Sequence, residues 1–195
     1  MLREVGPVPF PEFTGERVYM VPFRMAEGLP AALARWQPTV NAMMHRSWSD
    51  GHIYIMIDQR TVPAGETHRR PGAHIDGNWL ADADTHGGSH GGRHRPTKRA
   101  DAGDRWSVED FAPEALILAS DVYGCDGWVG STETVRDSIR AGGSCADVAL
   151  EEFQRVPLAP NVAWAGNVTF VHESVPIPSG SRRSLVRLNV PGMAI

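Results

Sequence analysis

The sequence predicts a mainly β domain with minor α content. The chain of 195 residues holds 15 Pro and 20 Gly spread along its length, which suits many short strands joined by tight turns. Its length is enough to bury one core and too short for two comfortable domains. We therefore expect a single domain spanning residues 1–195.

Composition narrows the function classes. Hydrophobic residues make up 42% and charged residues 22%, and the net charge of -4 argues against a protein whose whole surface binds nucleic acid. No basic N-terminal segment precedes an apolar run, and no stretch approaches the ~20 apolar residues of a membrane span. We expect a soluble, cytoplasmic protein without a membrane partner. Cys125 and Cys145 are then expected to be reduced thiols.

The N-terminal part predicts an extended arm, a strand and a helical region. Residues 1–13 contain three prolines and should be extended, either as an edge of the domain or as an arm that grips a neighbouring subunit in a homo-oligomer. Residues 16–23 predict the first strand. Residues 29–36 predict a short helix flanking the sheet, which Pro38 ends or kinks before helix resumes over 40–48.

A clear strand and a long loop follow. Residues 52–58 alternate isoleucine with other side chains, as a half-buried strand does. Residues 81–106 are rich in His, Gly and Arg, which predicts a long loop acting as a lid. His86, His90 and His94 repeat every four residues, but paired glycines interrupt the helix that would align them on zinc. The cations of this loop would attract an anionic substrate, nucleic acid included, although a solvated basic loop is the simpler interpretation.

The C-terminal half predicts further strands separated by Pro and Gly turns, with one helix between them. The expected strands cover residues 115–120, 153–158, 162–165, 168–172 and 184–190, and the expected helix covers 131–140.

The strongest chemical signal is His74-x-Asp76. Two positions apart on an extended strand, these side chains leave the same face and can converge on one ion. His172, at the end of a later strand, is our third ligand. Two neutral imidazoles and one carboxylate, with other positions open, form the ligand set of a non-heme ferrous oxygenase.

The order His74-x-Asp76, a long insertion, His172 and then a basic residue resembles the Fe(II)- and 2-oxoglutarate-dependent oxygenase superfamily. The resemblance covers roughly residues 54–190. It implies a double-stranded β-helix, which is a jelly-roll or cupin-like fold, with Fe(II) and 2-oxoglutarate as cofactors. It also implies oxidative decarboxylation of 2-oxoglutarate coupled to hydroxylation of a substrate C–H bond.

A basic residue on the last strand would bind the far carboxylate of 2-oxoglutarate, for which arginine supplies a fork of donors. Arg182 and Ser184 lie on the more apolar face of that strand, so we expect them to face the cavity and bind the cosubstrate. Arg183, on the other face, is the reserve if a bulge shifts the register. Tyr54 and Trp164 are candidate pocket residues.

The alternative function is non-catalytic. A jelly-roll binding or assembly protein, such as a virion component, could keep the oxygenase scaffold, because fold does not fix function. The proline-rich arm and the compact size support it. The substrate stays open among small molecules, nucleobases and peptides. Succinate formation from 2-oxoglutarate distinguishes the two functions.

Overall fold

The computed structural model describes residues 2–45, 47–81, 92–94, 105–106, 111–130 and 139–195. Within them the chain is mainly β. Its strands are β1 (Leu2–Pro7), β2 (Arg17–Phe23), β3 (Ile53–Val62), β4 (Trp79–Ala81), β5 (Gly92–His94), β6 (Arg105–Trp106), β7 (Glu114–Ser120), β8 (Cys125–Val129), β9 (Ile139–Arg140), β10 (Gln154–Pro157), β11 (Val162–Asn167), β12 (His172–Ser174) and β13 (Ser181–Pro191). Its helical segments are η1 (Ala31–Trp36), α1 (Gln37–Met43), η3 (Ala141–Gly143) and η4 (Leu150–Glu152).

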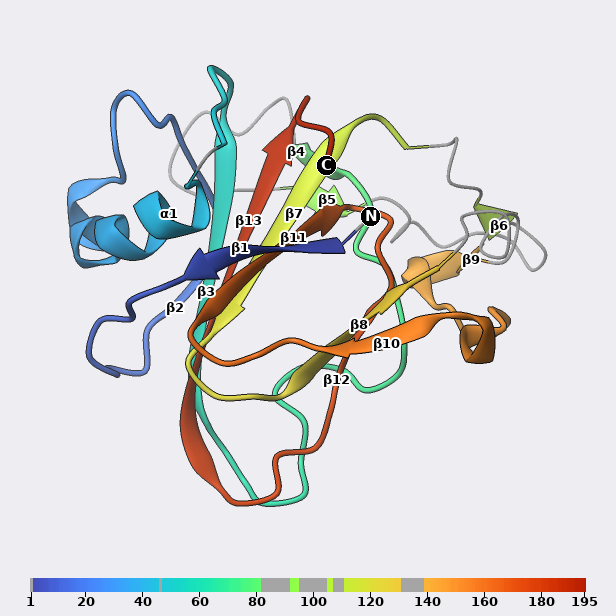
Figure 1. The fold of residues 1–195 in the computed structure, drawn as a ribbon. Coiled ribbons are helices and arrows are strands. Elements are labelled where there is room, and N and C mark those ends of the chain that lie inside the picture. Colours follow the sequence, from blue (N-terminus) through green and yellow to red (C-terminus); the bar gives the residue numbers. More distant parts are fainter. Residues whose placement is uncertain (1, 46, 82–91, 95–104, 107–110, 131–138) are drawn as a thin grey trace.

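The larger sheet has six strands in the order β1-β11-β7-β13-β3-β2, and each neighbouring pair is antiparallel (Figure 1). Alternation along the central strand β13 gives this sheet two different faces. Val186, Leu188 and Val190 point to one face and join the main apolar core. Arg183 and Arg187 point to the other face and line a cavity.

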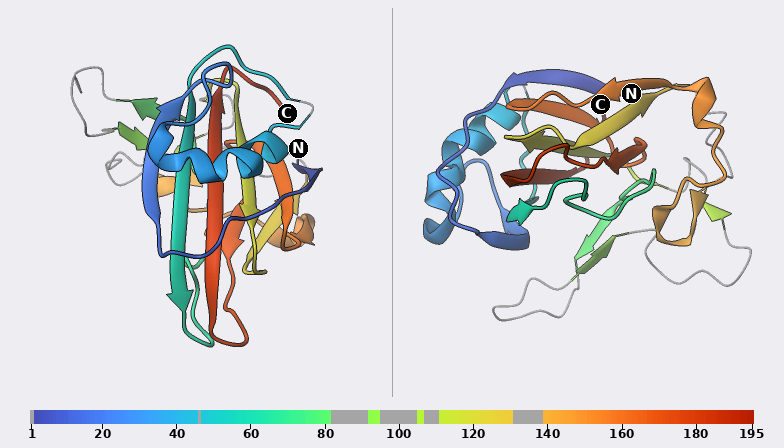
Figure 2. Two further views of the ribbon diagram at one scale, coloured as in Figure 1. Left: turned by 90° about the vertical axis from the view of Figure 1, so that its left-hand side faces the viewer. Right: turned by 90° about the horizontal axis from the view of Figure 1, so that it is seen from below.

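The segments η1 and α1 cover the apolar face, as Figure 2 shows. Trp36 and Val40 are fully buried there. The helical region expected from the sequence is present, but its bounds differ. The first part is a 3-10 helix, and Pro38 lies in the first turn of α1 instead of ending a helix, because proline needs no N–H partner there. The α-helix ends at Met43 and does not extend to residue 48.

A three-stranded antiparallel sheet, β10-β8-β12, packs on the opposite side of the larger sheet. Leu158 and Phe170 meet Leu116 and Leu118 of β7 in a second apolar cluster. The strand expected over 168–172 is absent except for its last residue, because Val168 and Thr169 form a turn after β11 and β12 begins only at His172. This sheet therefore carries one of the candidate ligands over the cavity.

The remaining segments complete the described part of the chain. β1, within the proline-rich arm, forms an edge of the larger sheet by pairing with β11. Most of the expected loop at 81–106 and most of the expected helix at 131–140 lie outside the described residues; residues 139–140 form β9 instead of helix. His86 and His90 also lie outside the described residues.

Both cysteines are free thiols. Among the described helices, none has the length and apolar character needed to cross a membrane.

Candidate metal centre

An antiparallel bridge brings the two candidate histidines side by side. The backbone N–H of His74 donates to the carbonyl of His172, and the reverse bond has the same length of 2.9 Å. The stretch around His74 is an isolated bridge, not the regular strand expected from the sequence. It is extended nevertheless, and the centroids of the two imidazole rings lie 4.5 Å apart.

Backbone carbonyls fix how each imidazole faces the site. The Nδ1 of His74 lies 2.8 Å from the carbonyl oxygen of Gly72, and the Nδ1 of His172 lies 3.2 Å from that of Phe170. A carbonyl only accepts, so each Nδ1 carries the proton and each Nε2 keeps its lone pair. This outer hydrogen bond is the one that metal-binding histidines usually make.

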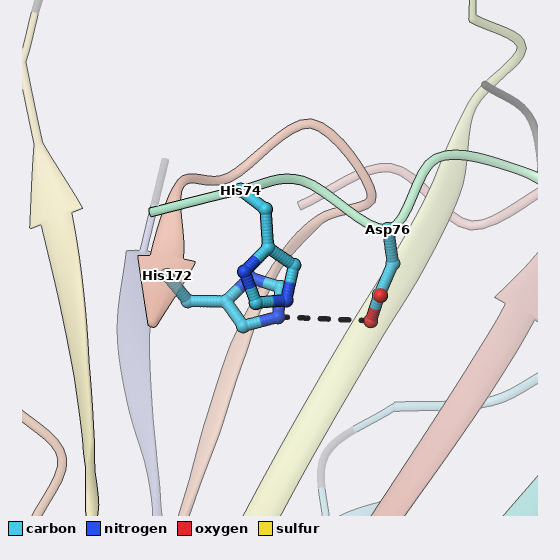
Figure 3. Close-up of side chains that lie close together, drawn as sticks. All are labelled: His74, Asp76 and His172. Atoms are coloured by element: carbon cyan, nitrogen blue, oxygen red, sulfur yellow. Dashed lines mark ion pairs between the residues drawn. The ribbon is translucent and has the colours of Figure 1, made fainter. Parts of the chain in front are cut away.

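Asp76 completes the group. Figure 3 shows its carboxylate facing the two rings, with Nε2 of His172 3.7 Å from Oδ2 of Asp76. One ligand atom from each of His74, Asp76 and His172 lies within 4.8 Å of the others. That spacing allows one ion to contact all three after small side-chain movements. The structure thus brings together the three residues that the sequence singles out.

The electrostatics leave all three groups in the form that a cation needs. Burial, followed by the neighbouring His172, lowers the pKa of His74 to about 3. Burial also lowers the pKa of His172. Burial alone would raise the pKa of Asp76, but Arg187 and then His172 outweigh it and hold that pKa well below its usual value. At neutral pH the site presents two neutral imidazoles and one carboxylate, a donor set that fits Fe(II).

Arg187, which sequence reasoning missed, holds the carboxylate in place. Its Nη1 donates to Oδ2 of Asp76 at 2.7 Å, and its Nη2 donates to Nε2 of His94 at 2.7 Å. A bulge in β2 places the buried sulfur of Met20 3.3 Å from the same Nη2. Arg187 therefore orients Asp76, and an incoming metal ion would share that carboxylate with it.

A cavity of about 500 Å³ opens beside these residues. His74, Asp76 and His172 all line it. The same cavity is bordered by basic side chains that had no part in the predicted iron site: the arginines Arg60, Arg69, Arg70 and Arg187 and the histidines His68 and His94. The run His68-Arg69-Arg70, directly before the His74 stretch, was the available signal for part of this set.

The expected orientation of the last strand is wrong. Arg182 is exposed, with its guanidinium 5.5 Å from the ring centroid of Phe13. The hydroxyl of Ser184 lies on the helix-covered side and accepts a hydrogen bond from Gln59 at 3.0 Å. Neither residue lines the cavity. The reason is that the apolar face of β13 packs under the helical layer, which leaves the charged face toward the cavity.

Arg183, the reserve residue, lines the cavity and is 1% exposed. Its Nε donates to Ser120 Oγ at 2.8 Å and to the carbonyl of Val122 at 3.1 Å. Its Nη1 is buried and has no hydrogen-bond partner among the described residues. Gly124 makes room for it, since a Cβ there would lie 3.0 Å from Cζ of Arg183. This guanidinium is held by one edge and keeps donors free at the other.

The two candidate pocket residues do not line the main cavity. Tyr54 packs against Trp79, with ring centroids 6.0 Å apart. Trp164 borders a separate, much smaller hollow.

The fold and site together define a mainly β protein with a candidate metal centre of two histidines and one aspartate. No family model matches the chain, and no curated protein matches it. Among solved structures, EvdMO1 is 13% identical with a TM-score of 0.37, and the match covers 82% of this chain and 32% of EvdMO1. AviO1 from Streptomyces viridochromogenes Tue57 is 14% identical with a TM-score of 0.41, and the match covers 100% of this chain and 91% of AviO1. The chain thus spans about a third of the length of EvdMO1 and nearly all of AviO1.

Proposed function

We propose that this protein is an Fe(II)- and 2-oxoglutarate-dependent oxygenase with a jelly-roll fold, which hydroxylates a C–H bond of its substrate. The observation that carries the proposal is the meeting of His74, Asp76 and His172 on the wall of one cavity, with ligand atoms within 4.8 Å. Two histidines and one carboxylate with open positions form the ligand set of non-heme iron oxygenases.

The iron, when bound, would supply the oxidative chemistry, in which 2-oxoglutarate, dioxygen and the substrate yield succinate, carbon dioxide and the hydroxylated substrate. The protein holds the reactants. The hydrogen bonds of His74 and His172 to backbone carbonyls fix both Nε2 atoms toward the ion. Arg187 keeps Asp76 ionised and aimed at the same point.

Arg183 is the residue that we assign to the far carboxylate of 2-oxoglutarate. Ser120 and Val122 hold its Nε, so the guanidinium plane is fixed before the ligand arrives. The buried Nη1 has no partner among the described residues, and leaving such a donor unpaired costs free energy that an incoming carboxylate would recover. His68 is also buried and lines the same cavity.

The test measures cofactor binding and turnover together. Anaerobic addition of Fe(II) and 2-oxoglutarate to the full chain should produce a weak visible charge-transfer absorption, and air should then produce succinate. Asp76→Asn should abolish both signals, because it removes the charge that holds the metal and keeps an oxygen that accepts from Arg187.

Asp126→Asn is the matched control. Asp126 is also a buried carboxylate paired with an arginine, Arg155, but it does not line the cavity. The control should retain both signals, even if its stability falls as much as that of Asp76→Asn. A wild-type protein that binds metal without absorbing or forming succinate would favour the non-catalytic binding protein instead.

A further inference from the structure

The described wall of the cavity carries far more positive than negative charge. Five arginines line it: Arg60, Arg69, Arg70, Arg183 and Arg187. Asp76 is the one acidic side chain among the described lining residues. Such an excess in a partly buried site is unfavourable unless a ligand brings compensating negative charge.

Three of these arginines have assigned partners. Arg187 pairs with Asp76, and Arg183 is assigned to the cosubstrate carboxylate. Arg60 makes a two-point contact with Asp58, through Nε to Oδ1 at 3.1 Å and Nη2 to Oδ2 at 2.6 Å. Arg69 and Arg70 remain.

Asp58 does not neutralise Arg69. It is 3% exposed, does not itself line the cavity, and is shared by several basic side chains. Besides Arg60, the exposed Arg17 lies 3.3 Å away, and His68 lies 3.4 Å away. Arg69 reaches the same carboxylate with one nitrogen at 3.2 Å. The single negative charge of Asp58 is therefore shared by Arg17, Arg60 and Arg69. Most N–H donors of the Arg69 guanidinium remain available to a ligand.

Arg70 has no carboxylate partner among the described residues. Its Nη2 donates to the backbone carbonyl of Gly142 at 2.7 Å, which positions the guanidinium without cancelling its charge. Gly142 lines the cavity as well. This exposed side chain is held at the cavity wall by that one bond, and its other donors make no hydrogen bond to a described residue.

The two arginines approach the site from different sides. Arg69 extends toward β3 and also borders a second hollow beside Tyr19 and Asp58. Arg70 extends toward the segment at Gly142. Both line the cavity that His74, Asp76 and His172 also line.

We propose that Arg69 and Arg70 form a second anion subsite, which binds a phosphate or carboxylate group of the substrate beside the metal centre. Guanidinium groups bind both anions through paired hydrogen bonds. Both arginines are less buried than Arg183, so a ligand can reach them from solvent. Assigning the bound anion to the substrate rests on the proposed oxygenase function, whereas anion binding by these two arginines does not.

The test titrates the metal-free full chain with inorganic phosphate, and separately with acetate, by isothermal calorimetry. The double variant Arg69→Gln/Arg70→Gln should weaken phosphate binding at least about tenfold, because both forks are lost. Arg70→Gln alone should weaken it severalfold, and it removes just one bond to a backbone carbonyl, so it keeps the test valid if the double variant folds poorly. A preference for phosphate over acetate indicates a phosphorylated substrate, and similar affinities indicate a carboxylate.

Arg24→Gln and Arg183→Gln serve as controls. Arg24 is exposed, pairs with Glu27 and does not line the cavity, so its removal should leave phosphate affinity unchanged. Arg183→Gln should weaken 2-oxoglutarate binding in the Fe(II) complex and spare phosphate. The proposal is overturned if phosphate does not bind, if only Arg183→Gln weakens it, or if the Arg69 and Arg70 variants weaken 2-oxoglutarate as strongly as Arg183→Gln. If phosphate binding depends on Arg70 but the protein does not bind 2-oxoglutarate, the anion subsite stands and the proposed oxygenase function is wrong.

Discussion

The two faces of the six-stranded sheet are built from the same strands and differ in almost every other respect. The helix-covered face buries Ile55 and Ile57 of β3 against Val186 and Leu188 of β13. The cavity face of the same two strands carries charged side chains, Asp58 and Arg60 on β3 and Arg183 and Arg187 on β13. Alternation along each strand separates the two sets.

The comparison assigns different tasks to the two faces. The apolar face contributes stability by removing large side chains from water. The cavity face buries arginines and carboxylates, which are costly to desolvate and contribute little net stability even when paired. Burying these arginines and carboxylates on the cavity face is costly in free energy, and ligand binding best explains why they are there.

The largest expected effect is that a substitution on the apolar face lowers stability without changing ligand affinity, whereas a substitution on the cavity face lowers ligand affinity with little change in stability. Leu188→Ala should lower the free energy of unfolding by about 2–5 kcal/mol, because Leu188 is fully buried, and should leave 2-oxoglutarate affinity of the folded protein unchanged. Arg183→Met should weaken 2-oxoglutarate about 100-fold through lost charge-assisted bonds, with a change in stability below about 1.5 kcal/mol. Urea unfolding and the charge-transfer titration measure the two quantities. Equal losses of stability in both variants would contradict the division of tasks.

A smaller effect concerns pH. Burial and then Arg187 lower the pKa of His94 to about 4 in the folded protein, below the unfolded value of about 6.5. Between these values the unfolded chain binds more protons, so the stability of the metal-free protein should fall as the pH falls from about 6.5 to 4. His94→Gln keeps an acceptor for Arg187 and removes one titrating group. It should reduce that slope by up to about 1.4 kcal/mol per pH unit, measured by urea unfolding at several pH values. If the free energy of unfolding changes with pH equally in the wild-type protein and in His94→Gln, His94 is not the source of the pH dependence.

Sequence reasoning located the mainly β architecture and the meeting of His74, Asp76 and His172. It succeeded there because the spacing of two within His74-x-Asp76 puts both side chains on one side of any extended backbone, regular strand or not. The partner of Asp76 was out of reach, because Arg187 lies 111 positions away and only the fold reveals the contact.

The orientation of β13 was predicted wrongly for a physical reason. A rule that turns the more apolar face inward fails when both faces are buried, one under a helical layer and one around a cavity. Arg183 is 1% exposed although it is charged, and no local pattern shows that Ser120, Val122 and Gly124 accommodate it. The run His68-Arg69-Arg70 was visible in the sequence, but its placement on the cavity wall depends on Asp58 and Gly142 elsewhere in the chain.

The central claim is that three side chains hold one metal ion, and anomalous diffraction from crystals soaked anaerobically with Fe(II) tests it most directly. We predict a peak at bonding distance from Nε2 of His74, Nε2 of His172 and a carboxylate oxygen of Asp76, and we predict its loss in Asp76→Asn. A peak at other residues, or no peak at full Fe(II) loading, would contradict the account.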